Sequence, residues 1–235
     1  TIKTYLASLK AVINRMGGDG RELFRNVSIG KKRTSQPIFN WQQMEKVHHT
    51  EPEEGTKDMY ARDTFIFQHD AMGMPFVDLM NLTKNNLRNG HIVYHRVKTG
   101  EEVSVPLLPE LKAILDKYKR EDSPWLFPFW HEGKSDRPRT VLARYNRYLV
   151  ELSENYGLPR MTSYTARRTW ATNAYRNGID MQVIQRGLGH ASVTTTLRYI
   201  QDIDQSAVDA ACASMVVHLK QRKKGQKEGK IYVNC

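Results

Sequence analysis

The chain has 235 residues and carries 36 Lys and Arg against 25 Asp and Glu, which gives a net charge of +11 and a pI near 9.6. This basic balance favours nucleic acid or an anionic membrane surface as partner, and because no apolar run approaches the roughly 18 residues of a membrane span, nucleic acid is preferred. Two cysteines, Cys212 and Cys235, are too few for a disulfide framework or a cysteine-based zinc site, so the composition fits a reducing cytoplasm.

The first 36 residues have the pattern of a helix followed by a linker. Apolar side chains recur at helical spacing over 1–16, and the sequence MGGDG ends that helix. The segment is polar throughout and begins without Met, so we interpret it as an internal helix of a longer chain and not as a signal peptide. We expect a helical remnant and linker over 1–36, a main domain over 37–219 and a basic tail over 220–235. Alternatively, the helix is a frayed N-terminal helix of a single domain.

The first half of the main domain is predicted to contain two helices and a β-hairpin. One apolar helical stripe begins at Trp41, and a second helix covers 59–71 before Gly73 and Pro75 break it. Alternation over 91–98 then predicts a strand, which a Lys-Thr-Gly-Glu turn connects to a second strand. One face of the first strand carries Ile92, Tyr94, Arg96 and Lys98, and the turn lifts Lys98 off the sheet.

The second half is predicted to be helical. Pro109 opens one helix, and a longer helix carries an apolar stripe from Val141 to Leu152 and ends before Gly157. These stripes predict buried faces. The fold class is therefore mainly α with a small antiparallel β-sheet.

The segment 162–201 places three polar side chains on successive elements. Thr162 or Ser163 caps a helix in which Tyr164 and Arg167 are i,i+3 neighbours on one face. Asp180 caps a shorter helix, which Gly187 and Gly189 end, so His190 falls on the turn that follows. A last helix over 192–200 is predicted to carry Tyr199.

Three motifs in this segment, Ala-Arg-Arg-Thr-Trp-Ala-Thr, Leu-Gly-His and Thr-Thr-x-x-Tyr, occur in order over nearly forty positions. Together they resemble the C-terminal signature of the tyrosine recombinases, the phage-type integrase family. The resemblance implies a nucleophilic tyrosine at Tyr199, a phosphate-binding arginine at Arg167 and a hydrogen-bonding histidine at His190. It also implies that Lys98, in the β-hairpin, protonates the departing 5′-oxygen.

These residue types suit DNA strand cleavage. A phenol with a pKa of about 10 attacks phosphate poorly unless cations assist it. The planar fork of Arg167 can bind two non-bridging oxygens and offset the charge that builds on the phosphorane. Since arginine and lysine supply the positive charge, we expect neither a metal ion nor another cofactor.

The sequence shows two departures from the family pattern, the first at the first arginine and the second at two histidines. The usual first arginine precedes an acidic residue, here Asp78, but Met72 and Pro75 occupy the places where that arginine would align. A histidine often found at the helix start is replaced by Tyr164, which can still donate one hydrogen bond, and Arg168 replaces the histidine that often follows the second arginine. The missing arginine puts cleavage activity in question.

The resemblance also implies how the chain works with its partners. Residues 1–36 would be the remnant of a helical core-binding domain and its linker, and 37–219 the catalytic domain. The partner would be double-stranded DNA in a bacterial cytoplasm, at the nucleoid, with four protomers on two duplexes and a monomer or dimer without DNA. The segment Asp204 to Leu219 is the candidate for a helix that packs on a neighbouring protomer.

Three other classes of function stay open at this point: a protein of the same fold that binds DNA without cutting it, a type IB topoisomerase, and a metal-dependent nuclease. Each candidate residue also has a structural alternative. Tyr199 can be a packing aromatic, Arg167 a solvated helix charge, Lys98 a hairpin-turn cation and His190 a turn-capping residue. The arginines of the long helix, at positions 139, 144 and 147, are interpreted as a solvated face.

Overall fold

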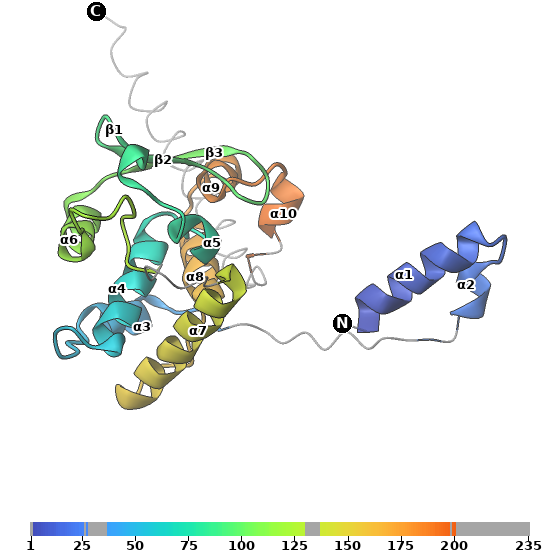
Figure 1. Cartoon of the computed structure of the whole chain (residues 1–235), viewed down its shortest axis with the longest axis horizontal. Coiled ribbons are helices and arrows are strands. Elements are labelled where there is room, and N and C mark those ends of the chain that lie inside the picture. The colour runs from blue at the N-terminus through green and yellow to red at the C-terminus, as the bar shows by residue number, and fades with distance from the viewer. Residues whose placement is uncertain (1, 26, 28–36, 130–136, 198, 201–235) are drawn as a thin grey trace, which may run out of the picture. The chain divides into compact units, whose positions relative to one another are not determined.

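This computed structural model describes residues 2–25, 27, 37–129, 137–197, 199 and 200, and the chain forms two compact units, Thr1–Ser35 and Gln36–Cys235 (Figure 1). The basic tail predicted over 220–235 and the exchanging helix predicted over 204–219 lie outside the described residues.

The first unit contains two helices. Helix α1 covers Ile2–Arg15, close to the predicted 1–16. Helix α2, Gly20–Leu23, lies inside the stretch that was predicted to be a linker. It forms because the Asp19 carboxylate accepts the backbone N–H groups of Arg21 and Glu22, which satisfies the first donors of the helix.

In the second unit, several helices begin at a side-chain cap. The cap is Asn40 for α3 (Trp41–His48), Thr56 for α4 (Lys57–Asp70), Thr162 for α8 (Ser163–Arg176) and Asp180 for α9 (Met181–Leu188). Helices α6 (Pro109–Tyr118) and α7 (Pro138–Asn155) instead have proline in their first turn, where a missing N–H costs nothing. The helices that were predicted from apolar periodicity are confirmed.

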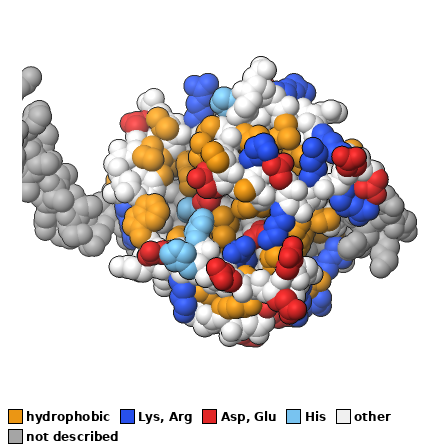
Figure 2. Space-filling model, turned by 90° about the vertical axis from the view of Figure 1, so that its left-hand side faces the viewer, with side chains coloured by type: hydrophobic (Ala, Val, Ile, Leu, Met, Phe, Trp, Pro, Cys, Tyr) orange, Lys and Arg blue, Asp and Glu red, His pale blue; other side chains and the backbone are white. Residues whose placement is uncertain are grey.

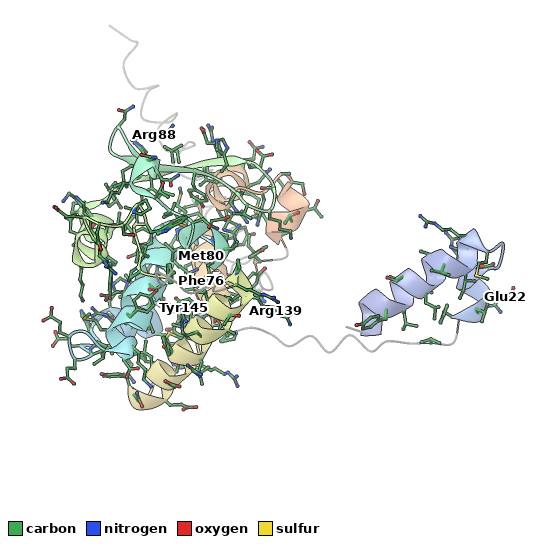
Figure 3. All side chains as sticks on the ribbon, in the orientation of Figure 1. Glu22, Phe76, Met80, Arg88, Arg139 and Tyr145 are labelled. Atoms are coloured by element: carbon green, nitrogen blue, oxygen red, sulfur yellow. The ribbon has the colours of Figure 1, made fainter. Side chains whose placement is uncertain are left out.

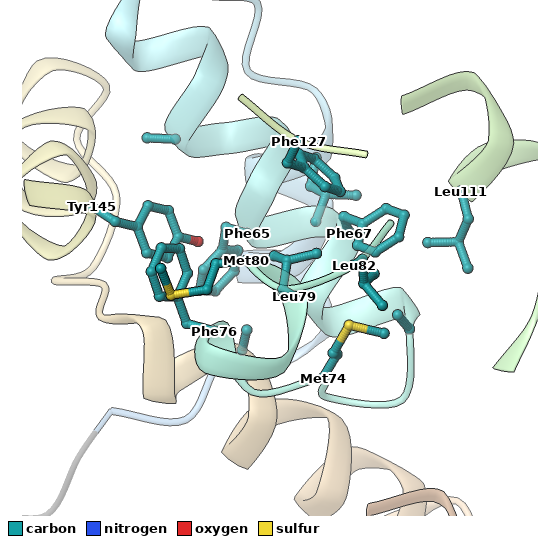
Figure 4. Packing of buried hydrophobic residues seen from close by; sticks show 14 of the residues in the cluster. Phe65, Phe67, Met74, Phe76, Leu79, Met80, Leu82, Leu111, Phe127 and Tyr145 are labelled. Atoms are coloured by element: carbon teal, nitrogen blue, oxygen red, sulfur yellow. The ribbon is translucent and has the colours of Figure 1, made fainter. Parts of the chain in front are cut away.

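Helix α4 lies at the centre of this unit, packed against α3, α6, α7 and α8. A short helix α5 (Phe76–Leu79) follows it after the turn at Gly73 and supplies further core residues. Figure 4 shows the Phe76 ring stacked on Tyr145 of α7, with centroids 4.6 Å apart, while the Tyr145 hydroxyl donates to Gln68 of α4 at 2.9 Å. Figure 3 shows Phe76 and Tyr145 inside the unit, whereas Arg88 and Arg139 are exposed.

The small sheet is antiparallel, in the order β1 (Leu87–Arg88), β2 (His91–His95), β3 (Glu102–Pro106). Ile92 faces Val105 and Tyr94 faces Val103, all four buried, so the predicted hairpin and its buried face are confirmed. The first strand ends at His95, earlier than predicted, and Lys98 lies in the turn. Strand β1 was not predicted, because two exposed residues carry no alternation. A 3₁₀ helix, η1 (Lys84–Asn86), precedes it.

The predicted helix over 192–200 is too long. Helix α10 covers only Val193–Leu197, and Tyr199 lies in the turn after it. Three consecutive β-branched threonines have low helix propensity. In addition, the Thr172 hydroxyl of α8 donates to the Tyr199 carbonyl at 3.2 Å, and the Tyr199 N–H donates to the Thr196 carbonyl at 2.9 Å, which closes a turn there. None of the helices in the described ranges is long and apolar enough to cross a bilayer.

Candidate active site

The Tyr199 ring lies against three of the side chains that the sequence singled out. Its centroid is 4.8 Å from the His190 ring and 5.4 Å from the Tyr164 ring, and the guanidinium carbon of Arg167 lies 5.4 Å from the same centroid. Thus α8, the turn after α9 and the turn after α10 bring Tyr164, Arg167, His190 and Tyr199 together.

Arg167 is a buried residue of α8, with 2% of its surface exposed, and it connects three segments. Its Nη1 donates to the Gly73 carbonyl at 2.8 Å, and its Nη2 donates to the Leu188 carbonyl at 2.6 Å and lies 2.9 Å from His190 Nε2. Burial, followed by the charge of Arg96, lowers the pKa of Arg167. The Nε donor of Arg167 is buried and has no hydrogen-bond partner in the described part of the chain. The interpretation of Arg167 as a solvated helix charge is therefore wrong.

His190 follows the C-cap of α9, where Gly189 has a left-handed conformation. Burial, then the charges of Arg167, Arg96 and Lys98, lower the pKa of His190 to about 4. The imidazole is therefore neutral at pH 7, and since Nε2 faces an arginine it must accept. Nδ1 then carries the proton and donates to the Thr196 hydroxyl at 2.9 Å.

Tyr164 and Lys98 differ from the residues just described. Tyr164 is 44% exposed at the start of α8, and burial together with hydrogen bonding to Tyr199 raises its pKa. Lys98 is exposed in the hairpin turn, and it has no hydrogen-bond or ion-pair partner among the described residues. The charge of Lys98 helps to lower the pKa of His190, but the structure does not bring Lys98 into contact with Tyr199.

Sequence reasoning missed a second buried arginine beside Arg167. Arg96, 7% exposed, donates from Nε to the buried Asp78 carboxylate at 2.6 Å, and from Nη1 to the Leu188 carbonyl and, at 3.2 Å, to the Gly189 carbonyl. Arg96 and Arg167 thus share one acceptor, the Leu188 carbonyl. The signal was present, because the strand alternation puts Arg96 on the same face as Ile92 and Tyr94, where a charge needs a buried partner.

The model of the phage integrase family matches residues 42–206, which include every residue of this site. The chain belongs to the phage integrase family. Tyrosine recombinase XerC of Rickettsia prowazekii is 30% identical over 138 residues, 56% of this chain and 44% of that protein. XerC of Rickettsia canadensis is 32% identical over 136 residues, 55% of this chain and 43% of that protein. The integrase-family chain therefore spans less than half the length of these relatives.

Solved structures share the fold of this integrase-family chain. The Tn1549 transposon integrase bound to transposon right end DNA has a TM-score of 0.66 and 15% identity, with 92% of this chain and 79% of that chain covered. A lambda integrase dimer bound to a core site has a TM-score of 0.61 and 18% identity, covering 86% and 72%. The predicted fold class, mainly helical with a small antiparallel sheet, is confirmed.

Two glycines with positive φ let the arginines of this integrase-family site approach the backbone. A Cβ on Gly73 (φ +66°) would lie 2.9 Å from the Arg167 Cα, and one on Gly189 (φ +59°) would lie 2.6 Å from Val103 Cγ2 and 2.9 Å from Arg96 Cγ. Such distances are shorter than any ordinary carbon contact, so each glycine is required for packing as well as for its backbone angle.

We expect Gly73→Ala to lower the free energy of unfolding by about 2–4 kcal/mol, because left-handed strain and a clash with Arg167 add together. The matched control is Gly55→Ala, where φ is +77° but no atom lies within 4 Å of the added Cβ. That variant carries the strain alone and should lose about 1–2 kcal/mol. Urea denaturation measures both, and equal losses would show that the contact with Arg167 is not tight.

The lowered pKa of His190 predicts a pH dependence of stability. The unfolded chain takes up a proton on His190 near pH 6.5, whereas the folded chain does so only near pH 4. The stability that neutral His190 contributes is therefore complete above pH 6.5 and is lost as the pH falls toward 4. Urea denaturation at pH 7 and pH 5 should show a larger loss for the wild type than for His190→Gln. The same loss in both proteins would contradict the lowered pKa.

In the described ranges, no cluster of three or more His, Cys, Asp or Glu side chains could hold a metal ion. The face shown in Figure 2, on the side of α3 and α6, carries Lys and Arg interspersed with Asp and Glu. On α7, Arg147 lies 3.7 Å from Glu151 and Arg144 donates to the Phe129 carbonyl, so both have partners within the protein.

Proposed function

We propose that this chain cleaves and rejoins DNA strands through a 3′-phosphotyrosine at Tyr199, without a metal ion. The observation that carries the proposal is the position of the Tyr199 ring, 5.4 Å from the Arg167 guanidinium carbon and 4.8 Å from the His190 ring. A tyrosine that served only for packing would not need a buried cation over its ring and a neutral histidine beside it.

In the cleavage step, the Tyr199 oxygen forms a bond to phosphorus and the bond from phosphorus to the 5′-oxygen breaks. Tyr199 loses its phenolic proton to water, and the Lys98 ammonium gives a proton to the 5′-oxygen and then regains one from water, so the step has no net gain or loss of protons. Arg167 binds non-bridging oxygens and stabilises the charge of the phosphorane. Attack by a 5′-hydroxyl on the phosphotyrosine reverses the step and rejoins a strand.

The burial of Arg167 and His190 supports this proposal, whereas Tyr199 is partly buried and Lys98 is exposed. Lys98 lies in an exposed hairpin turn, which can move. The proton acceptor for Lys98 is the departing 5′-oxygen of the DNA, so Lys98 acts only after its turn contacts the substrate. His190 keeps its proton on Nδ1 through Thr196 and orients Arg167, while Tyr164 donates to the phosphate in place of a histidine.

The wider assembly follows from the same proposal. Residues 37–219 act as the catalytic domain, and 1–36 are the remnant of a core-binding domain. Four protomers act on two duplexes, and residues 204–219 pack on a neighbour. Because phosphate contacts dominate the affinity of such proteins, DNA binding should weaken steeply as salt increases.

A pool of duplexes with a randomised centre and nicks at staggered positions tests the cleavage step. Cleavage beside a nick releases a short 5′-hydroxyl strand, so the covalent adduct accumulates and is seen on a denaturing gel. We expect an adduct with the wild type and with Tyr175→Phe, a partly buried tyrosine of α8, but none with Tyr199→Phe. Sequencing the trapped DNA identifies the target.

One observation favours a second function, DNA binding without cleavage: Met72 and Pro75 occupy the two places where the first arginine of the family would align. Retention of duplexes by the wild type with no adduct would support that function and contradict the proposal. Relaxation of supercoiled plasmid with no strand exchange would indicate a topoisomerase, and loss of cleavage with a chelator would indicate a nuclease that depends on a metal ion.

A further inference from the structure

In the family, one segment carries the first arginine followed by an acidic residue. Here that segment contains the acidic residue, Asp78, but no arginine. Met72 and Pro75 occupy the two places where that arginine would align, and neither side chain can donate a hydrogen bond; Pro75 directly precedes α5. Asp78, three residues later, is fully buried as a side chain. A buried carboxylate needs a partner, and here the partner is Arg96, from the end of strand β2.

Asp78 fixes both the side chain and the backbone of this part of the hairpin. One carboxylate oxygen accepts from Arg96 Nε at 2.6 Å, and the other accepts from the Val97 N–H at 2.8 Å. The stem of Arg96 crosses Gly189, where a Cβ would lie 2.9 Å from Arg96 Cγ. Arg96 is therefore held against the turn that carries His190.

The two guanidinium groups leave donors unused. Arg96 donates through Nε and Nη1, and its Nη2 has no hydrogen-bond partner among the described residues. The Arg167 Nε is buried, and it too has no hydrogen-bond partner among these residues. Both groups bind the Leu188 carbonyl, so the free donors belong to neighbouring cations at one place.

Like charges this close repel each other, and an anion between them would offset the repulsion. The charges that act on His190 are those of Arg167, Arg96 and Lys98, all positive, so the site contains more positive charge than Asp78 neutralises. A phosphodiester that gains charge in its transition state fits such a place.

We propose that Arg96 replaces the missing arginine and, together with Arg167, binds the scissile phosphate. This inference rests on the proposed cleavage by Tyr199. Arg96 supplies a second cation from the residue that follows strand β2 instead of from a helix, with Nη2 as its free donor and Asp78 as the carboxylate that orients it. The alternative is that the pair of Arg96 and Asp78 serves only to hold the hairpin in place.

A substrate without charge at the scissile position separates these two roles. In a methylphosphonate duplex a methyl group replaces one non-bridging oxygen, and the scissile group is uncharged. An arginine that offsets phosphate charge therefore contributes less to the cleavage rate on this duplex. We expect Arg96→Gln to slow adduct formation on the phosphodiester by about 10²–10³-fold, as for a lost oxyanion donor. On the methylphosphonate, the difference from the wild type should shrink below about tenfold.

The control is Arg62→Gln, because Arg62 is also a mostly buried arginine that pairs with a buried carboxylate, Asp63, and donates to a backbone carbonyl. It should leave the rates on both duplexes unchanged. Arg96→Lys keeps the charge and should lose less activity than Arg96→Gln, which provides a second variant if the glutamine protein does not fold. Equal slowing of Arg96 variants on both duplexes, or no slowing, would overturn the inference.

A binding measurement keeps this inference separate from the proposed function. Tyr199→Phe protein cannot form an adduct, so its affinity for charged and methylphosphonate duplexes can be compared with and without Arg96→Gln. A preference for the charged duplex that disappears with Arg96→Gln supports the phosphate contact even where the wild type forms no adduct. No such preference, or one that persists without Arg96, overturns it.

Discussion

Arg167→Lys is expected to reduce adduct formation by about 10³-fold although it keeps the positive charge. The Arg167 guanidinium reaches the Gly73 carbonyl, the Leu188 carbonyl and His190 at once, and an ammonium group cannot replace this geometry. It also offers no fork to the phosphate. The yield of covalent adduct with time, on the duplex selected above, measures the effect.

Two controls test whether the effect of Arg167→Lys is specific to this arginine and whether the variant is folded. Arg62→Lys changes another arginine that donates to a backbone carbonyl, in the first half of α4, and should leave the adduct yield unchanged. Circular dichroism and a melting curve show whether Arg167→Lys is folded at the assay temperature. A folded variant with wild-type yield would contradict the role given to the fork.

Asp78→Ala is expected to lower the free energy of unfolding by about 3–5 kcal/mol, because it leaves the Arg96 charge buried without its counter-charge. The Val97 N–H loses its acceptor as well. Urea denaturation at neutral pH measures the loss. Asp116→Ala, which removes an exposed carboxylate that pairs with Lys112 on α6, is the control and should change stability by less than about 1 kcal/mol.

The double variant Asp78→Ala with Arg96→Ala tests the reason for that loss. Removing both charges abolishes the uncompensated one, so the double variant should be less destabilised than the sum of the two single variants. Additive losses would mean that Asp78 and Arg96 contribute independently, and that the short contact between them does not determine the stability of the hairpin.

Much of the fold could be predicted because its signals are local. Asn40, Thr162 and Asp180 cap helices through bonds to N–H groups two or three residues away, and the alternation of Ile92 and Tyr94 needs only a single buried face. The end of the last helix was predicted wrongly because it depends on the Thr172 hydroxyl, a contact from a distant part of the chain.

The site was predictable only in part for the same reason. Motif spacing pointed to Arg167, His190 and Tyr199, which the structure brings together. It did not point to Arg96, whose place beside Arg167 depends on a strand edge, on Asp78 and on the end of α9 meeting in space. For Lys98 the opposite holds. The sequence pattern pointed to Lys98, but its side chain is exposed to solvent in the structure without DNA.

The Leu188 carbonyl that both arginines bind belongs to the backbone, so no substitution of a side chain can remove it. Evolution or an engineer can exchange the leucine at this position for another apolar residue and keep the oxygen in place. A change in the course of the main chain, such as an insertion or a proline at residue 189, would separate the two cations instead. Diversification of this site is therefore constrained more by loop length between α9 and α10 than by the chemistry of residue 188.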